Sequence, residues 1–195
     1  NENELIKKNV LKGMLQGYFS HVEQNICIDK NRYWLEYAEM AAALLDGKEN
    51  VKILVTVRDL RDVLASFEHL YRKTSALSQV PIDQNNPLKC KTALGRFEMF
   101  IDDAQPVGRA FNAIRDAITR GWGPNMHIVD YDKLTTNPAQ TVQSIYKFLG
   151  EGLYQHDFDN VEQITWEDDA AYGFKDLHVI RTQVEPQAPR WPSTF

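Results

Sequence analysis

The stretch VKILVTVRDLRDVLASFEHLYRK, at positions 51–73, decides the fold of this chain. Its first seven residues form a nearly continuous apolar run rich in β-branched side chains, which is typical of a strand covered on both faces. Asp59 then stands where a helix N-cap belongs, with Asp62 three residues later as in a capping box. Apolar residues recur after it at helical spacing. The stretch therefore predicts a buried strand, a short charged turn and an amphipathic helix.

Two polar side chains of this stretch are candidates for binding a phosphate. Arg58 directly follows the predicted strand, and Ser66 lies eight residues later at the border of the apolar stripe. Ligands of open α/β sheets bind at the carboxyl ends of strands, beside helix N-termini that favour anions. The guanidinium fork suits a phosphate bidentately, and a hydroxyl can add a donor. From spacing alone, a surface ion pair of Arg58 with Asp59 or Asp62 is the alternative.

The rest of the chain alternates predicted strands and helices. Alternating strands and helices indicate βαβ units, so the predicted fold class is α/β, with a mainly parallel sheet flanked by helices. The expected elements are a helix over 2–19, a strand over Asn25–Asp29, a helix over Tyr33–Leu45, a loop over 74–90, helical structure over 91–121 broken near Pro106, a strand over Met126–Tyr131, and a helix from the N-cap Asn137 to Gly150.

The length and the net charge of the chain limit which classes of function are possible. A chain of 195 residues suits a single domain, which we expect to span 1–195. A net charge of −5 argues against a general affinity for nucleic acid. The apolar runs are too short to span a membrane, and no signal peptide is visible. Only three strands are evident and no initiator Met is present, so we expect the first strand of the sheet to lie upstream of Asn1.

The cysteines indicate neither a zinc site nor a disulfide framework, because Cys27 and Cys90 are the only two and lie far apart. We expect a buried thiol at Cys27 and an incidental one at Cys90. This usage fits a reducing compartment, so the expected location is cytoplasmic.

Further site candidates lie where the other strands end. Lys30 follows the predicted strand over Asn25–Asp29 and could neutralise charge on a transferring group. Tyr131 ends the strand in IVDYDKL, where its ring could pack on a base. The alternatives are a lysine that merely reaches water and an aromatic side chain of the core or rim. Late in the chain, four residues could return to close a site, but the sequence assigns them no role: His178, Arg181, Arg190 and Trp191.

Several common motifs are absent from the sequence. It contains no GxxxxGK[ST] loop, no GxGxxG after a strand, no GxSxG elbow and no HExxH. The five histidines are scattered, so we expect no metal.

Three segments taken in order resemble the sulfotransferases that use 3'-phosphoadenosine 5'-phosphosulfate (PAPS). IDKNRYW is similar to the segment in which a lysine follows a strand. VKILVTVRDLRDVLASF is similar to the 3'-phosphate element, including its Arg-to-Ser spacing. VDYDKLTTNPAQTVQSIYKFLG resembles the segment whose helix ends in Phe-Leu-Gly. The pattern is nearest to bacterial-type and tyrosylprotein-type members, because DKNR replaces the Lys-Thr-His of the cytosolic steroid and phenol enzymes.

The resemblance implies a P-loop-like α/β fold that binds PAPS and releases 3'-phosphoadenosine 5'-phosphate (PAP). It implies that Arg58 and Ser66 hold the 3'-phosphate, that Tyr131 contacts adenine, and that Lys30 stabilises the sulfuryl group in an in-line displacement without a metal. The acceptor would be a hydroxyl of a small molecule, a carbohydrate or a peptide tyrosine.

One element of the family pattern is missing from these residues. The Gly/Ser/Thr-rich loop for the 5'-phosphosulfate is absent, and we expect it before Asn1. The catalytic base is also unassigned. Two other functions therefore stay open: a small-molecule kinase of P-loop fold, which an upstream GKS or GKT would favour, and a non-catalytic PAP-binding or scaffold protein that has lost the loop.

Overall fold

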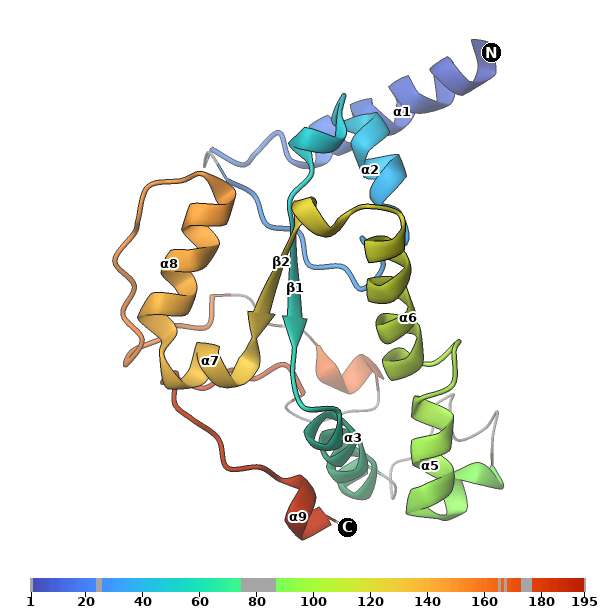
Figure 1. Cartoon of the computed structure of the whole chain (residues 1–195), viewed down its shortest axis with the longest axis vertical. Coiled ribbons are helices and arrows are strands. Elements are labelled where there is room, and N and C mark those ends of the chain that lie inside the picture. Colours follow the sequence, from blue (N-terminus) through green and yellow to red (C-terminus); the bar gives the residue numbers. More distant parts are fainter. Residues whose placement is uncertain are drawn as a thin grey trace. The chain divides into compact units, whose positions relative to one another are not determined.

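A computed structural model of the chain describes residues 2–23, 26–74, 87–164, 166, 168–172 and 177–194 (Figure 1). The chain divides into two compact units. The first comprises residues 1–54 and 110–127, and the second comprises residues 55–109 and 128–195. Most of the predicted 74–90 loop lies outside the described residues.

Two hydrogen-bonded strands form the sheet of the described chain: β1 (Ile53–Val57) and β2 (Met126–Asp130). Their arrows run in the same direction in Figure 1, and helices connect them, as a parallel pair requires. Val55 and Val129 are buried, whereas Thr56 is exposed. The α/β class and a parallel pair are thus present, but β1 is less completely covered than its apolar run predicts.

The predicted strand over Asn25–Asp29 is wrong for the residues that the structure describes. Residues 26–29 adopt no regular secondary structure, and Ile28 is exposed. Three apolar residues are too short a run to hold a strand without a neighbour to pair with. Asp29 instead makes a local contact, because its carboxylate accepts a hydrogen bond from the Trp34 indole N–H at 2.7 Å.

The expectation for the two thiols is also wrong. Cys27 is exposed and Cys90 is buried, the reverse of the prediction. Cys90 lies in the hydrophobic cluster of the second unit, whereas Cys27 belongs to the segment that forms no strand.

The first unit is mainly helical. The predicted N-terminal helix is confirmed, but none of its residues is buried, and its apolar side is exposed. The predicted helix over Tyr33–Leu45 is shorter than expected, because its first five residues form turns. The unit contains α1 (Glu2–Tyr18), α2 (Ala38–Leu44), the 3-10 turns η1 (Lys48–Asn50) and η4 (Gly123–Asn125), and most of α6 (Pro106–Thr119).

Polar side chains join α2 to the end of α6 within this unit. Glu39 accepts a hydrogen bond from the Trp122 indole N–H at 2.7 Å and pairs with Arg120. Arg120 also donates to the carbonyl of Leu35 at 2.7 Å. The Trp122 bond is the largest of the effects that hold the pKa of Glu39 below its usual range.

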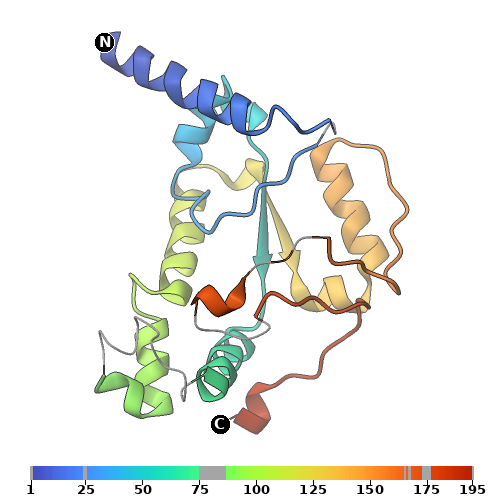
Figure 2. The same cartoon turned by 180° about the vertical axis from the view of Figure 1, so that it is seen from behind.

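The second unit holds the predicted central helix and the elements that pack on it. Figure 2 shows the same elements from behind, with α9 beside α3 as in Figure 1. The elements are α3 (Leu60–Thr74), the 3-10 turns η3 (Lys89–Lys91) and η5 (Asp169–Tyr172), α5 (Ala93–Phe100), α7 (Tyr131–Thr136), α8 (Pro138–Leu149) and α9 (Trp191–Thr194).

Three helix boundaries follow the predicted signals, whereas Asn137 precedes α8 without a side-chain cap hydrogen bond. Asp59 caps α3, since its carboxylate accepts the backbone N–H of Arg61 at 2.8 Å. The predicted break near Pro106 is confirmed, because α5 ends at Phe100 and α6 begins at the proline. Gly150 ends α8 in the left-handed conformation, with φ of 79°.

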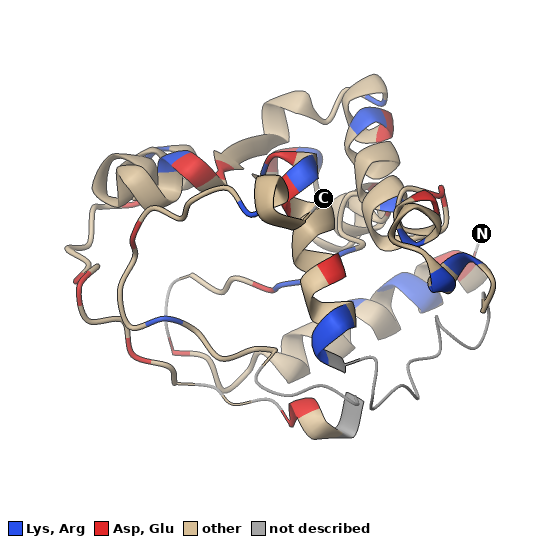
Figure 3. Cartoon of the chain, turned by 90° about the horizontal axis from the view of Figure 1, so that it is seen from below, with Lys and Arg blue, Asp and Glu red and all other residues tan. Residues whose placement is uncertain are grey.

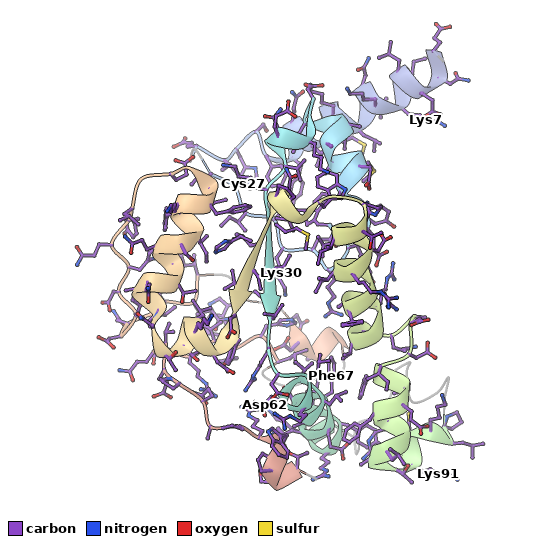
Figure 4. All side chains as sticks on the ribbon, viewed as in Figure 1. Lys7, Cys27, Lys30, Asp62, Phe67 and Lys91 are labelled. Atoms are coloured by element: carbon purple, nitrogen blue, oxygen red, sulfur yellow. The ribbon has the colours of Figure 1, made fainter. Side chains whose placement is uncertain are left out.

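Apolar side chains of α3, α5 and η3 form the core of the second unit. Phe67 stacks on Phe100 with ring centroids 4.6 Å apart (Figure 4 labels Phe67). Three apolar residues of the helical region over 91–121 lie outside this core and are more than half exposed: Ile101, Phe111 and Ile118. The cluster comprises Cys90, Met99, Phe100 and Val107, with Val63, Leu64 and Phe67 packed against it.

A matched pair of glycine substitutions tests the packing of α5. A Cβ added to Gly95 would lie 2.3 Å from the carbonyl oxygen of Lys89, so Gly95→Ala should lower the free energy of unfolding by about 1–3 kcal/mol. Gly13, inside α1, has open space around it, so Gly13→Ala should raise the free energy of unfolding by about 0.4–1 kcal/mol. Urea unfolding measures both. Equal effects of the two substitutions would contradict the close approach of α5 to η3.

Candidate functional site

Arg58 and Tyr131 lie together at the carboxyl ends of the two strands. Arg58 directly follows β1, and Tyr131 directly follows β2 as the first residue of α7. The guanidinium carbon of Arg58 lies 4.4 Å from the centroid of the Tyr131 ring. Because the strands are parallel, their carboxyl ends share one edge of the sheet, where α/β proteins bind ligands. The structure thus brings together two of the four residues that the sequence singled out.

The guanidinium of Arg58 is held from a second side by Asp62. Arg58 Nη2 donates to Asp62 Oδ2 at 3.2 Å, and the Arg58 side chain is only 18% exposed. Its Nε is buried and has no hydrogen-bond partner within the described residues. The alternative of an ion pair with Asp62 is therefore confirmed, although the pair is partly buried rather than on the surface. A guanidinium has five N–H donors, so this bond leaves others for a ligand.

Asp59 pairs with Arg61 instead of Arg58. The Asp59 carboxylate accepts from Nε and Nη2 of Arg61, and these bonds are the largest cause that lowers its pKa to about 2. Asp59 is therefore ionised near neutral pH. Figure 3 shows acidic and basic residues close together on α3. At the start of the helix they form pairs, Arg61 with Asp59 and Arg58 with Asp62.

Ser66 has an exposed side chain on α3. It lies four residues after Asp62, which places both side chains on the same face of the helix. Ser66 lies one helical turn beyond the carboxylate that holds Arg58.

Lys30 belongs to the first unit, in the segment between α1 and α2 (Figure 4). Its side chain is exposed. It follows Asp29, whose carboxylate holds the indole of Trp34, and Asn31 next to it accepts the backbone N–H of Tyr33 at 2.9 Å. These local bonds, rather than a strand, fix the chain on both sides of Lys30.

Two of the four residues singled out late in the sequence, Arg190 and Trp191, contact the start of α3. The backbone N–H groups of Arg190 and Trp191 donate to Asp62 Oδ1 at 2.7 and 3.2 Å. The ring of Trp191 also stacks under the guanidinium of Arg61, with 4.3 Å between the guanidinium carbon and the ring centroid. The C-terminal turn therefore lies beside the charged turn that follows β1.

The other two late residues, His178 and Arg181, pair with acidic residues that are near them in the sequence. His178 Nδ1 lies 2.5 Å from Asp169 Oδ1, and its backbone N–H donates to Asp169 Oδ2 at 3.0 Å. That backbone bond is the largest cause that lowers the pKa of Asp169 below its usual range. Arg181 pairs with Glu185, with 3.9 Å between Arg181 Nη1 and Glu185 Oε1.

Sequence reasoning found only part of the role of Asp62. It offered a capping-box residue or an ion pair with Arg58, but not the hydrogen bonds that Asp62 accepts from the C-terminal turn. An acidic residue four positions after an arginine does signal an ion pair on a helix. The partners at 190 and 191 leave no such local signal, because they lie far along the chain.

Across the described ranges, no three His, Cys, Asp or Glu side chains gather in a way that could hold a metal ion. In the part of the chain that the structure covers, no helix is long and apolar enough to cross a membrane.

Comparison with known proteins identifies the family. The model of the sulfotransferase domain family matches residues 34–171, which is more than half of the chain. The match includes Arg58, Ser66 and Tyr131, whereas Lys30 precedes it. No curated protein and no solved structure gives a significant match.

The chain therefore belongs to the sulfotransferase domain family. This family implies a P-loop-like α/β fold, with which the helices and the small parallel sheet agree. Its members transfer a sulfuryl group to hydroxyl acceptors.

Proposed function

We propose that this protein is a PAPS-dependent sulfotransferase that transfers the sulfuryl group to a hydroxyl and releases PAP. The observation that carries the proposal is the contact between Arg58 and Tyr131 at the carboxyl ends of β1 and β2. Two of the three segments that resemble the family supply these residues, and a nucleotide site needs them near one another. We further propose that residues 1–195 belong to one sulfotransferase-like domain.

The chemistry of Arg58 fits a 3'-phosphate. Its position after β1 places a guanidinium where the sheet binds ligands, and Asp62 and Tyr131 fix the orientation of the group. The buried Nε, which has no hydrogen-bond partner among the residues that the structure describes, is a donor that a phosphate oxygen would satisfy. Ser66 adds its hydroxyl from α3, one helical turn after Asp62. Tyr131 would contact the adenine through its hydroxyl or the ring face that Arg58 does not cover.

Lys30 would act at the reacting end of the donor. The acceptor oxygen forms a bond to sulfur while the bond from sulfur to the bridging 5'-phosphate oxygen breaks, and the hydroxyl proton passes to water. Negative charge grows on the departing phosphate oxygen, and an ammonium group placed there stabilises the transition state. Catalysis by this chain would then rest on positioning and electrostatics. The proposed acceptor is a hydroxyl of a small molecule, a carbohydrate or a peptide tyrosine.

Calorimetric titration of variants with PAP and with 5'-AMP tests the proposed clamp. Each charge-assisted hydrogen bond to the 3'-phosphate is worth roughly 1.5–3 kcal/mol, so Arg58→Ala should reduce the preference for PAP by about tenfold or more. The affinity for 5'-AMP should change little. Arg115→Ala, which removes an exposed arginine of α6, is the control and should keep the preference. An unchanged preference in Arg58→Ala would contradict the assignment.

A further inference from the structure

Asp62 is the buried centre of the contacts at the start of α3. It is only 4% exposed, and its two carboxylate oxygens face different parts of the chain. Oδ2 accepts from the guanidinium of Arg58, and Oδ1 accepts the backbone N–H groups of Arg190 and Trp191. A single carboxylate therefore links the residue after β1 to the C-terminal turn (Figure 4 labels Asp62).

The C-terminal turn is held on α3 at further points. Trp191 stacks against Arg61 in the first turn of the helix. Near the other end of α3, Arg72 Nη2 donates to the carbonyl oxygen of Thr194 at 3.3 Å. These contacts fix α9 along α3, so the two backbone N–H groups stay directed at Asp62.

Helix capping does not account for Asp62. The N-cap of α3 is Asp59, which accepts the Arg61 backbone N–H. A buried carboxylate without such partners would be strongly destabilising, and here one guanidinium and two amides satisfy it. Because the guanidinium is that of Arg58, the arrangement orients the residue proposed to bind phosphate.

We infer that Asp62 is a positioning residue of the donor site, which couples the C-terminal turn to Arg58. The carboxylate holds the Arg58 guanidinium in one orientation, and the turn at 190–191 in turn holds the carboxylate. Affinity for the 3'-phosphate therefore depends on a backbone N–H at the far end of the chain. The inference rests on the proposed function, because it concerns the same site.

Asp62→Asn is the first test, with Asp59→Asn as the matched control. The amide keeps one oxygen for the backbone N–H groups but loses the charge that holds Arg58. Calorimetry with PAP and 5'-AMP should show that Asp62→Asn reduces the preference for PAP about tenfold, the effect of losing roughly one charge-assisted bond, with 5'-AMP affinity nearly unchanged. Asp59→Asn removes the same charge from the neighbouring turn and should keep the preference.

A second pair of variants tests the coupling through the backbone. Arg190→Pro removes the N–H that Asp62 accepts at 2.7 Å, whereas Arg190→Ala removes the side chain and keeps the N–H. Arg190→Pro should therefore show a lower PAP preference than Arg190→Ala. Combining Arg190→Pro with Asp62→Asn should add little further loss, since both changes act on one contact.

The outcomes separate this inference from the proposed function. If the unaltered protein binds PAP no more tightly than 5'-AMP, the proposed function fails. If it prefers PAP, and Asp62→Asn keeps that preference while only the melting temperature falls, Asp62 has a merely structural role and the inference is overturned. Equal PAP preferences of Arg190→Pro and Arg190→Ala would overturn the coupling.

Discussion

Replacing Lys30 with alanine is expected to slow sulfuryl transfer by about 10²–10³-fold, the usual effect of removing one group that stabilises developing charge. The affinity for PAP should change far less, because the proposed role of the ammonium is to stabilise charge that appears only as the bond to sulfur breaks. Lys30 is exposed and lies between segments held by local hydrogen bonds, so the substitution should leave the fold intact.

The Lys30 measurement compares turnover with product binding. Transfer from PAPS is followed with a hydroxyl acceptor selected from a panel of phenols, sugars and tyrosine peptides, and PAP affinity is measured by calorimetry. Lys91→Ala is the control, since it removes an exposed lysine of η3 and should alter neither quantity. Equal losses of turnover and PAP affinity in Lys30→Ala would refute the role assigned to this residue.

The largest expected effect on stability comes from Glu68. Its side chain is fully buried in α3 and accepts hydrogen bonds from Arg96 at 2.6 and 2.7 Å and from Arg72 at 2.7 Å. Arg96 is also buried and lies over the ring of Tyr71. Glu68→Gln leaves the Arg96 charge buried without its partner, so the free energy of unfolding should fall by about 3–5 kcal/mol.

The Glu68 effect should depend on pH. Burial would raise the pKa of Glu68, but the hydrogen bonds from Arg96 and Arg72 outweigh it and hold the pKa below the ordinary 4.5. A carboxylate with a lowered pKa stabilises the fold above its unfolded-state pKa, and this contribution is lost as the pH falls through the folded-state value. The stability difference between the unaltered protein and Glu68→Gln should therefore shrink below about pH 4.

Urea unfolding at several pH values measures this prediction. Glu98→Gln is the control, because Glu98 is exposed on α5, and its replacement should change the free energy by less than about 0.5 kcal/mol. A loss for Glu68→Gln as small as that of the control would show that the buried ion pair does not stabilise the fold.

Local signals predicted much of the described fold. The apolar run before Arg58 became β1, and Asp59 caps α3 as its position after the strand indicates. Pro106 and Gly150 mark helix boundaries because each restricts or permits a particular backbone conformation. The prediction of a strand over Asn25–Asp29 was wrong because three apolar residues do not distinguish a strand from an irregular segment.

The site was predictable only where it follows from strand order. Arg58 and Tyr131 meet because the residues after parallel strands share one edge of the sheet, which the alternating pattern already implied. The second partner of Asp62 and the pairing of Glu68 with Arg96 were not predictable. Both join residues far apart in sequence, and such contacts depend on the folded chain rather than on local spacing.

The most direct test of the proposed donor is a calorimetric comparison of PAP with 5'-AMP on the unaltered chain. The two nucleotides differ in the 3'-phosphate alone, so the ratio of their dissociation constants isolates the site built around Arg58. We predict that PAP binds at least about tenfold more tightly, as expected from one or more charge-assisted hydrogen bonds. Equal dissociation constants would contradict the claim that this protein uses PAPS.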